Sequence, residues 1–163
     1  MISLFSCHRS NRQDTNSSTS FKNDFESSDV WTNRQTIIEC PAHSGKFACK
    51  LDSNIEFGVG FAEMAAKIGT KTPTEVSIKI WVNIPDLTAN STLVFHAIKT
   101  DGTNAFWFGV QLNKMVKKAN EWTEVDYKYK FPTELKGDEK VMIYTWNDGK
   151  KVWYADDLSV SFN

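Results

Sequence analysis

The sequence predicts an all-β fold made of two packed antiparallel sheets, a β-sandwich of jelly-roll topology. Apolar and polar residues alternate along most of the chain, and Gly, Asn, Asp and Pro separate the alternating runs. Short runs spaced in this way are typical of sandwiches. We expect one domain of roughly nine strands over residues 21–163, because the chain is long enough for one sizeable core and too short for two.

Three runs carry the alternation. Residues 75–84 place Trp81 and Asn83 on one face and five aliphatic side chains on the other: Val76, Ile78, Ile80, Val82 and Ile84. Residues 104–113 are expected to point four residues outward, Trp107, Gly109, Gln111 and Asn113, and four inward, Phe106, Phe108, Val110 and Leu112. In residues 121–131 the charged side chains alternate with Val125, Tyr127, Tyr129 and Phe131, which are expected to face the core.

Turn residues predict how the runs are joined. Asp101-Gly102 is expected to close a hairpin between residues 91–99 and 105–112. Asn147-Asp148-Gly149 is expected to close another, between residues 141–146 and 151–162. Only residues 61–69 have a helical pattern. They equally fit the end of a strand whose alternate positions are Ile55, Phe57, Val59 and Phe61.

Charge and composition argue against several classes of function. The 19 basic and 20 acidic side chains leave a net charge of −1, so no field would gather nucleic acid or an anionic membrane. No apolar run is long enough to span a bilayer. Aromatic residues make up 13% of the chain, with six Trp and eleven Phe, more than a core of this size requires. Some of these rings are therefore expected to face outward.

The first seven residues, MISLFSC, resemble the end of a bacterial lipoprotein signal, in which Cys7 would receive the lipid. Residues 8–20 contain no apolar side chain and are expected to form a flexible tether. Residues 1–20 together predict an exported protein that is lipid-anchored at the bacterial outer membrane or cell surface. The alternative is an apolar N-terminus without such a role.

The two remaining cysteines, Cys40 and Cys49, flank the segment PAHSGKFA. If the chain reverses around Ser44-Gly45, the two thiols fall opposite each other on paired strands, within reach of a disulfide. A bridge together with a lipid-bearing Cys7 would use all three thiols outside the cytoplasm. The alternative is a pair of small buried thiols.

Six parts of the sequence carry a resemblance to a known family: residues 23–27, Trp31, and residues 42–52, 76–82, 121–125 and 153–160. Their order and spacing resemble those of the jelly-roll carbohydrate-binding modules attached to xylanases and other bacterial glycanases, which also occur in surface lipoproteins. The resemblance covers essentially the whole predicted domain. Its motifs are short and scattered, so they point to the fold more specifically than to a ligand.

The resemblance implies a structural calcium ion where the first strand, the Ser-Gly turn and the last strand meet. Its ligands would be Glu26, carbonyl oxygens around Gly45 and Lys46, and Asp157, with Asp156 as the less favoured neighbour. Calcium is a hard ion that takes six to eight oxygen ligands, so mixed carboxylates and carbonyls suit it. The ion would explain two adjacent carboxylates in an apparent strand. The alternative is that one aspartate accepts backbone amide hydrogen bonds while the other faces water.

Outward-facing aromatic rings are the expected ligand surface. Sugars present apolar C–H faces ringed by hydroxyl groups, so flat rings bind them by stacking while amides fix their orientation. Trp81 and Trp107 are the leading candidates, and they would form one platform if their strands share a sheet. The full set of expected binding residues is Trp81, Trp107, Gln111, Asn83, Asn113 and Trp146.

These observations predict non-catalytic binding of a polysaccharide or oligosaccharide, with a glycan and other glycan-processing surface proteins as partners. No GxSxG, HExxH, phosphate-loop or dinucleotide motif occurs, and three His residues offer few general bases. Two alternatives stay open: a surface lipoprotein with a protein-interaction or structural role, and a jelly-roll glycoside hydrolase or polysaccharide lyase.

Overall fold

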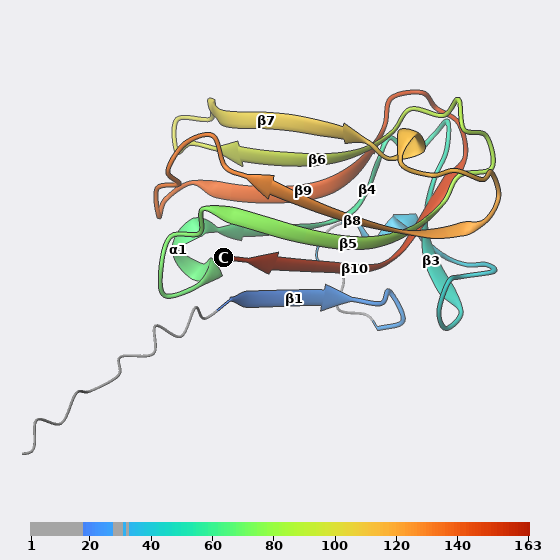
Figure 1. Ribbon diagram of the computed structural model, residues 1–163, viewed down its shortest axis with the longest axis horizontal. Coiled ribbons are helices and arrows are strands. Elements are labelled where there is room, and N and C mark those ends of the chain that lie inside the picture. The colour runs from blue at the N-terminus through green and yellow to red at the C-terminus, as the bar shows by residue number, and fades with distance from the viewer. Residues whose placement is uncertain (1–17, 28–30, 32) are drawn as a thin grey trace, which may run out of the picture.

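The computed structural model describes residues 18–27, 31 and 33–163. Within these residues the chain forms ten strands in two antiparallel sheets that pack face to face (Figure 1). The predicted two-sheet sandwich is confirmed. The first strand begins at Thr19, slightly before the expected start of the domain at residue 21. Cys7 lies outside the described residues, so its lipidation stays a prediction.

The larger sheet has six strands. Its order is β2 (Ile37–Glu39), β3 (Phe47–Leu51), β10 (Trp153–Phe162), β5 (Glu75–Asn83) and β8 (Trp122–Lys130). The sixth strand, β1 (Thr19–Asn23), pairs with the second half of β10, while β3 pairs with its first half. Two short strands therefore share one edge of the long final strand.

The smaller sheet has four strands, in the order β4 (Phe57–Met64), β9 (Lys140–Asn147), β6 (Ser91–Ile98) and β7 (Asn104–Gln111). Short helices stand at strand ends: α1 (Ala65–Ile68), η1 (Arg34–Thr36) and η2 (Leu112–Lys114). Both interpretations of residues 61–69 are thus partly right, because β4 continues to Met64 and one helical turn follows.

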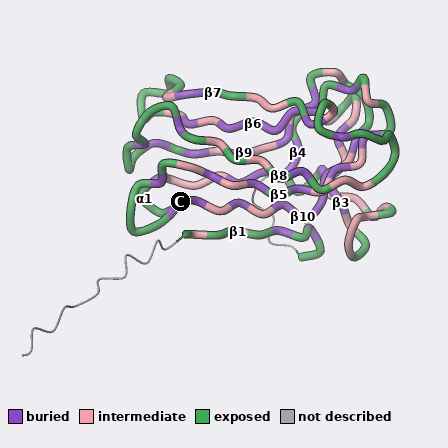
Figure 2. Tube along the Cα trace, in the orientation of Figure 1, coloured by how far each residue is buried: buried purple, intermediate pink, exposed green. Residues whose placement is uncertain are grey.

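The core lies between the sheets, and buried and exposed segments alternate along the strands (Figure 2). The alternation predicted for β5 is confirmed: its five aliphatic side chains are fully buried and Trp81 lies on the outer face. Burying one such aliphatic side chain stabilises a fold by about 1.5–3 kcal/mol. On the facing sheet, the ring of Phe95 stacks on that of Tyr129 from β8, with ring centroids 4.7 Å apart. Aromatic stacking thus joins the two layers.

The hairpin predicted at Asp101-Gly102 is confirmed by the pairing of β6 with β7. Asp101 Oδ1 accepts hydrogen bonds from the amide of Thr103, at 2.9 Å, and from its hydroxyl, at 2.6 Å. Gly102 has φ 82°, a left-handed conformation that glycine adopts without steric cost. The turn chemistry and the strand pairing agree.

The second predicted hairpin, at residues 147–149, is wrong. β9 lies in the four-stranded sheet, between β4 and β6, whereas β10 lies in the other sheet. The segment carries the chain from one layer to the other. Its Asn147 is fully buried and donates hydrogen bonds to the carbonyls of Asp52 and Lys151. Turn residues predicted the reversal correctly, but long-range packing determines which strand becomes the partner.

The predicted disulfide between Cys40 and Cys49 is also wrong in this structure, where both thiols are free. The Cα partner of Cys49 is Ile37, while the amide of Cys40 donates to the carbonyl of Lys46. Cys40 is therefore three residues out of register, roughly 10 Å along the strand, beyond the reach of a bridge. The Cys49 thiol is buried and hydrogen-bonds to the hydroxyl of Thr36.

None of the helices among the described residues is long and apolar enough to cross a bilayer.

Candidate functional site

Two tryptophans meet on the outer face of the four-stranded sheet. Trp107 of β7 lies opposite His96 of β6, and Trp146 of β9 lies opposite Thr92 of β6. The two indoles contact edge to face, with ring centroids 5.8 Å apart and planes at 84°. Trp107 keeps 46% of its surface exposed. One ring can therefore receive a flat ligand while the other stands as a wall beside it.

Gly109 makes room for this arrangement. A Cβ atom at Gly109 would lie 3.0 Å from Cη2 of Trp107 and 3.0 Å from Cγ2 of Thr92. The six-membered ring of Trp107 therefore lies over the bare backbone of its own strand. Val94, which pairs with Gly109 on this outer face, is fully buried. Side chains on the sheet surface cover it, so this part of the face is packed before any ligand arrives.

Beside the two indoles lies a cavity of about 330 Å³. Its lining is mainly apolar and comes from β4, β6 and β9, including Phe57, Ala62, His96, Met142 and Tyr144. Phe57 is 48% exposed, and its ring contacts that of Tyr144 at a centroid distance of 5.9 Å. We call the outer-face set of Phe57, His96, Trp107, Met142, Tyr144 and Trp146 the Trp107 face.

Hydrogen bonds fix the polar atoms of this face. The indole N–H of Trp146 donates to Oε1 of Glu56, at 3.0 Å. Nε2 of His96 lies 2.8 Å from Oδ1 of Asn104. Nδ1 of His96 is buried and has no partner among the described residues. The face thus combines aromatic surface with polar atoms held in place by the protein.

The predicted binding residues do not all come together. Gln111 is exposed and lies opposite Thr92, on the same face as Trp107 and Trp146. Asn113 follows in η2, where its amide group donates to the carbonyl of Leu87 at 3.0 Å. The other two predicted residues belong to β5, in the opposite sheet: Trp81 and Asn83. The platform expected from Trp81 and Trp107 is therefore absent, because their strands lie in different sheets.

Four residues of this face were not among the predicted binding residues: Phe57, Tyr144, Met142 and His96. The alternation in the sequence puts Phe57 in line with Val59 and Phe61, which are buried. The register of β4 against β9 shifts between Phe57 and Gly60, and this irregularity moves Phe57 to the outer face. The two-residue alternation of a strand sequence gives no sign of where a bulge interrupts it. Val141 and Ile143 alternate with Met142 and Tyr144 in the sequence, so the pattern alone leaves open which pair faces the core.

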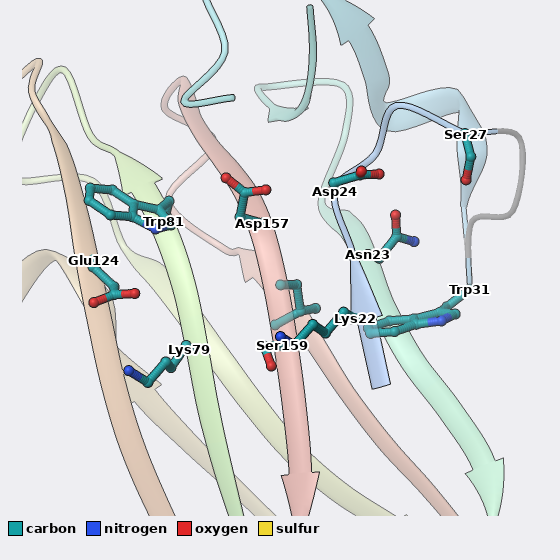
Figure 3. A pocket seen from close by; sticks show the side chains of 11 residues that line it. Lys22, Asn23, Asp24, Ser27, Trp31, Lys79, Trp81, Glu124, Asp157 and Ser159 are labelled. Atoms are coloured by element: carbon teal, nitrogen blue, oxygen red, sulfur yellow. The ribbon is translucent and has the colours of Figure 1, made fainter. Parts of the chain in front are cut away.

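Trp81 is held from one side by a histidine. The rings of His43 and Trp81 stack with centroids 3.6 Å apart and planes at 12°. Nδ1 of His43 lies 2.6 Å from Oδ2 of Asp157. The indole also lines a trough of about 890 Å³ on the outer face of the six-stranded sheet (Figure 3).

The adjacent aspartates sit at a bulge of β10. The register against β5 shifts between Asp156 and Ser159, and Asp157 has φ 47°. Asp156 is fully buried, and its Oδ2 accepts the amides of His43, at 2.9 Å, and Ser44, at 3.1 Å. Asp157 turns the other way, toward the side chains of the same turn. The Asp156 carboxylate therefore binds backbone amides of the turn, and the Asp157 carboxylate binds side chains of the same turn.

Burial raises the pKa of Asp156 from 3.8 to about 6, although the backbone amides of Ser44, Asp157 and His43 oppose the rise. The folded state then binds the proton more tightly than the unfolded chain does. The free energy of unfolding is expected to fall as pH rises from about 4 to about 6, by up to roughly 3 kcal/mol from this group. Urea unfolding at pH values from about 4 to about 7 measures the slope.

Asp156→Asn is the matched control, because the amide does not titrate. The difference in unfolding free energy between wild type and Asp156→Asn should change with pH, and this subtraction removes the contribution of all other titrating groups. A difference that stays constant across the range would contradict the raised pKa.

Two of the oxygen groups predicted to bind calcium already accept hydrogen bonds from backbone amides. Oε1 of Glu26 accepts the amides of Lys46, at 2.9 Å, and Phe47, at 2.8 Å. The carbonyl of Lys46 accepts the amide of Cys40. Within residues 18–27, 31 and 33–163 no group of three or more His, Cys, Asp or Glu side chains is placed to hold a metal ion. These carboxylates therefore accept backbone amides of the turn at residues 43–47, and calcium binding stays a prediction.

Thermal unfolding with calcium chloride, and then with excess EDTA, tests that prediction. If the oxygens near the turn hold the ion, calcium is expected to raise the melting temperature and EDTA to reverse the rise. Equal melting temperatures in both buffers would contradict it.

No family model and no curated protein sequence matches the chain. Solved structures do resemble it. One is the CBM22-1 xylan-binding domain of Xyn10C from Paenibacillus barcinonensis, at 15% identity over 87% of this chain and 92% of that one, with a TM-score of 0.53. Another is the C-terminal family 22 carbohydrate-binding module of Xyn10B from Clostridium thermocellum, at 18% identity, the same two coverages and a TM-score of 0.53.

A further xylan-binding domain of family 22 matches at 17% identity over 90% of this chain and 96% of that one, with a TM-score of 0.54. The resemblance to the modules of bacterial xylanases is thus confirmed at the level of the fold. At these identities the likeness shows a shared two-sheet jelly roll.

Proposed function

We propose that this domain binds a polysaccharide chain on the Trp107 face, without cleaving it. The observation that carries the proposal is the exposed indole of Trp107, which is supported below by Gly109 and at its side by Trp146. A pyranose ring presents a C–H face of similar size to an indole. Stacking the two removes apolar surface from water and sets polarised C–H groups against the negative face of the ring.

The surroundings of Trp107 suit a chain of sugar units. The cavity lined by Phe57, Met142 and Tyr144 lies next to the indole pair on the same face, so neighbouring units could lie along it. Gln111 and the carboxylate of Glu56 are placed at the margin, where hydroxyl groups need donors and acceptors. Ligand sites are typically lined by apolar and aromatic side chains with a few polar groups that fix the ligand's orientation, and this face has both.

The arrangement favours binding over hydrolysis. Glycosidases use two carboxyl groups across the scissile bond, one of them free to donate a proton. On the Trp107 face the carboxylate nearest the indoles, Glu56, already accepts the Trp146 N–H. The described residues of this face offer no second carboxylate opposite it. Xylan is the first ligand to test, because the similar solved domains are described as xylan-binding.

Affinity electrophoresis tests the proposal. Native gels that contain soluble xylan, mixed-linkage glucan or galactomannan are compared with a gel that contains no polysaccharide. We expect retarded migration of the folded protein in at least the xylan gel. Unchanged migration in all polysaccharide gels would overturn the proposal and favour a protein-interaction or structural role for the same fold.

A further inference from the structure

A second cavity lies on the opposite side of the molecule, over the six-stranded sheet. It is an open trough of about 890 Å³ whose floor is β10 and whose walls come from β1 on one side and β5 with β8 on the other (Figure 3). Trp81 lines one wall and Trp31 the other. No residue of the Trp107 face lines this trough, because the strands of the Trp107 face belong to the four-stranded sheet.

Trp81 is held in one orientation before any ligand arrives. His43 stacks on it, and Asp157 holds His43 at a distance of 2.6 Å. The ring of Trp122 contacts the same histidine, with centroids 6.1 Å apart. The bulge in β10 is what turns Asp157 toward this cluster. A ring fixed in this way loses little conformational entropy when it stacks on a ligand.

Trp31 is anchored as well. Its indole contacts Phe61 edge to face, with centroids 5.6 Å apart and planes at 89°. Phe61 is a core residue that is 4% exposed. Trp31 therefore bridges the core and the trough, and both walls carry a rigid aromatic group.

Hydrogen-bond donors and acceptors lie next to one another among the polar side chains that line the trough. Strand register sets Lys22 and Lys79 on either side of Ser159 in one row across the sheet. Glu124 and Asp24 add carboxylates to the two walls. The ammonium and carboxylate charges largely cancel, so the trough offers little net attraction to an ion. A hydroxyl group, which donates and accepts, can use both kinds of partner.

We propose that this trough is a second carbohydrate site, which takes a neutral oligosaccharide segment between Trp81 and Trp31. The proposal deepens the function proposed above and rests on it. Two sites on opposite faces would let one domain hold two chains, or two parts of one chain, and so raise its avidity for a polysaccharide surface.

Ser159→Tyr tests the trough without removing any of its walls, because the new ring fills the floor between Lys22 and Lys79. Ser77→Tyr is the matched control: Ser77 lies on the same outer face, opposite Ser161 of β10, and does not line the trough. The probes are xylohexaose, cellohexaose and laminarihexaose, each titrated calorimetrically into the full chain. The indole N–H signals of Trp31 and Trp81 are followed by NMR in the same titrations.

We expect two oligosaccharides per domain for wild type and Ser77→Tyr, and one for Ser159→Tyr. The indole signals of Trp31 and Trp81 should shift with ligand in the first two proteins and stay fixed in the third. A wild-type stoichiometry of one that Trp107→Ala abolishes, with fixed Trp81 and Trp31 signals, would overturn the second site and leave the Trp107 face intact.

The opposite pattern separates the two proposals in the other direction. If Ser159→Tyr abolishes all binding and Trp107→Ala leaves it unchanged, the trough stands as a site and the Trp107 face falls. Binding of none of the three hexasaccharides by the wild-type protein would overturn the trough, and electrophoresis in xylan would then decide the Trp107 face separately.

Discussion

Replacement of Trp107 by alanine is expected to abolish retardation of the protein in xylan gels while its melting temperature stays within a few degrees of wild type. The indole supplies the exposed stacking surface of the Trp107 face and is 46% exposed, so the ligand loses more contact than the fold does. Losing the burial of one large aromatic group costs about 1.5–3 kcal/mol. Binding should weaken roughly 10- to 100-fold.

Phe108→Ala is the control from the neighbouring position. Phe108 points to the other side of β7, where it stacks on Tyr129 with centroids 4.8 Å apart and planes at 8°. Phe108 is itself 36% exposed, so losing its stack on Tyr129 should lower the melting temperature only modestly. The two variants are expected to differ in xylan gels, where Phe108→Ala should still be retarded. Retention of xylan binding in a folded Trp107→Ala protein would remove the Trp107 face as the site.

Local alternation predicted much of this geometry. In a strand with one buried face, residues that alternate with the buried ones must point outward. This rule predicts outward positions for Trp81 and Trp107, and both predictions are confirmed. It could not place the two indoles relative to each other. Their relative position depends on which strands pair. β5 and β7 belong to different sheets, and contacts between residues far apart in sequence decide this pairing.

Two bulges also escape the alternation of apolar and polar residues. In β4 the bulge moves Phe57 to the surface, where it completes the cavity beside Tyr144. In β10 the bulge gives Asp156 and Asp157 different environments, although they are adjacent in the chain. Bulges depend on how two strands meet, so no single run of residues predicts them. Both occur at a candidate site, which is where a regular pattern is expected to break.

The largest effect on stability is expected from Gly60→Ala. A Cβ atom at this position would lie 2.4 Å from the carbonyl oxygen of Ile143 and 2.7 Å from Cα of Tyr144, both backbone atoms of β9. Side-chain rotation cannot relieve such contacts, so β4 and β9 must separate. We expect the free energy of unfolding in urea to fall by about 3 kcal/mol.

Gly137→Ala is the matched glycine control, because its new Cβ would meet the Cβ of Ala66 at 3.3 Å and otherwise finds room. Its unfolding free energy should stay within about 1 kcal/mol of wild type. The separation of β4 from β9 also displaces Phe57 from Tyr144, so Gly60→Ala should bind xylan more weakly even where it is still folded. Equal stability of the two glycine variants would contradict the register of β4 on β9, and with it the cavity on which the Trp107 face depends.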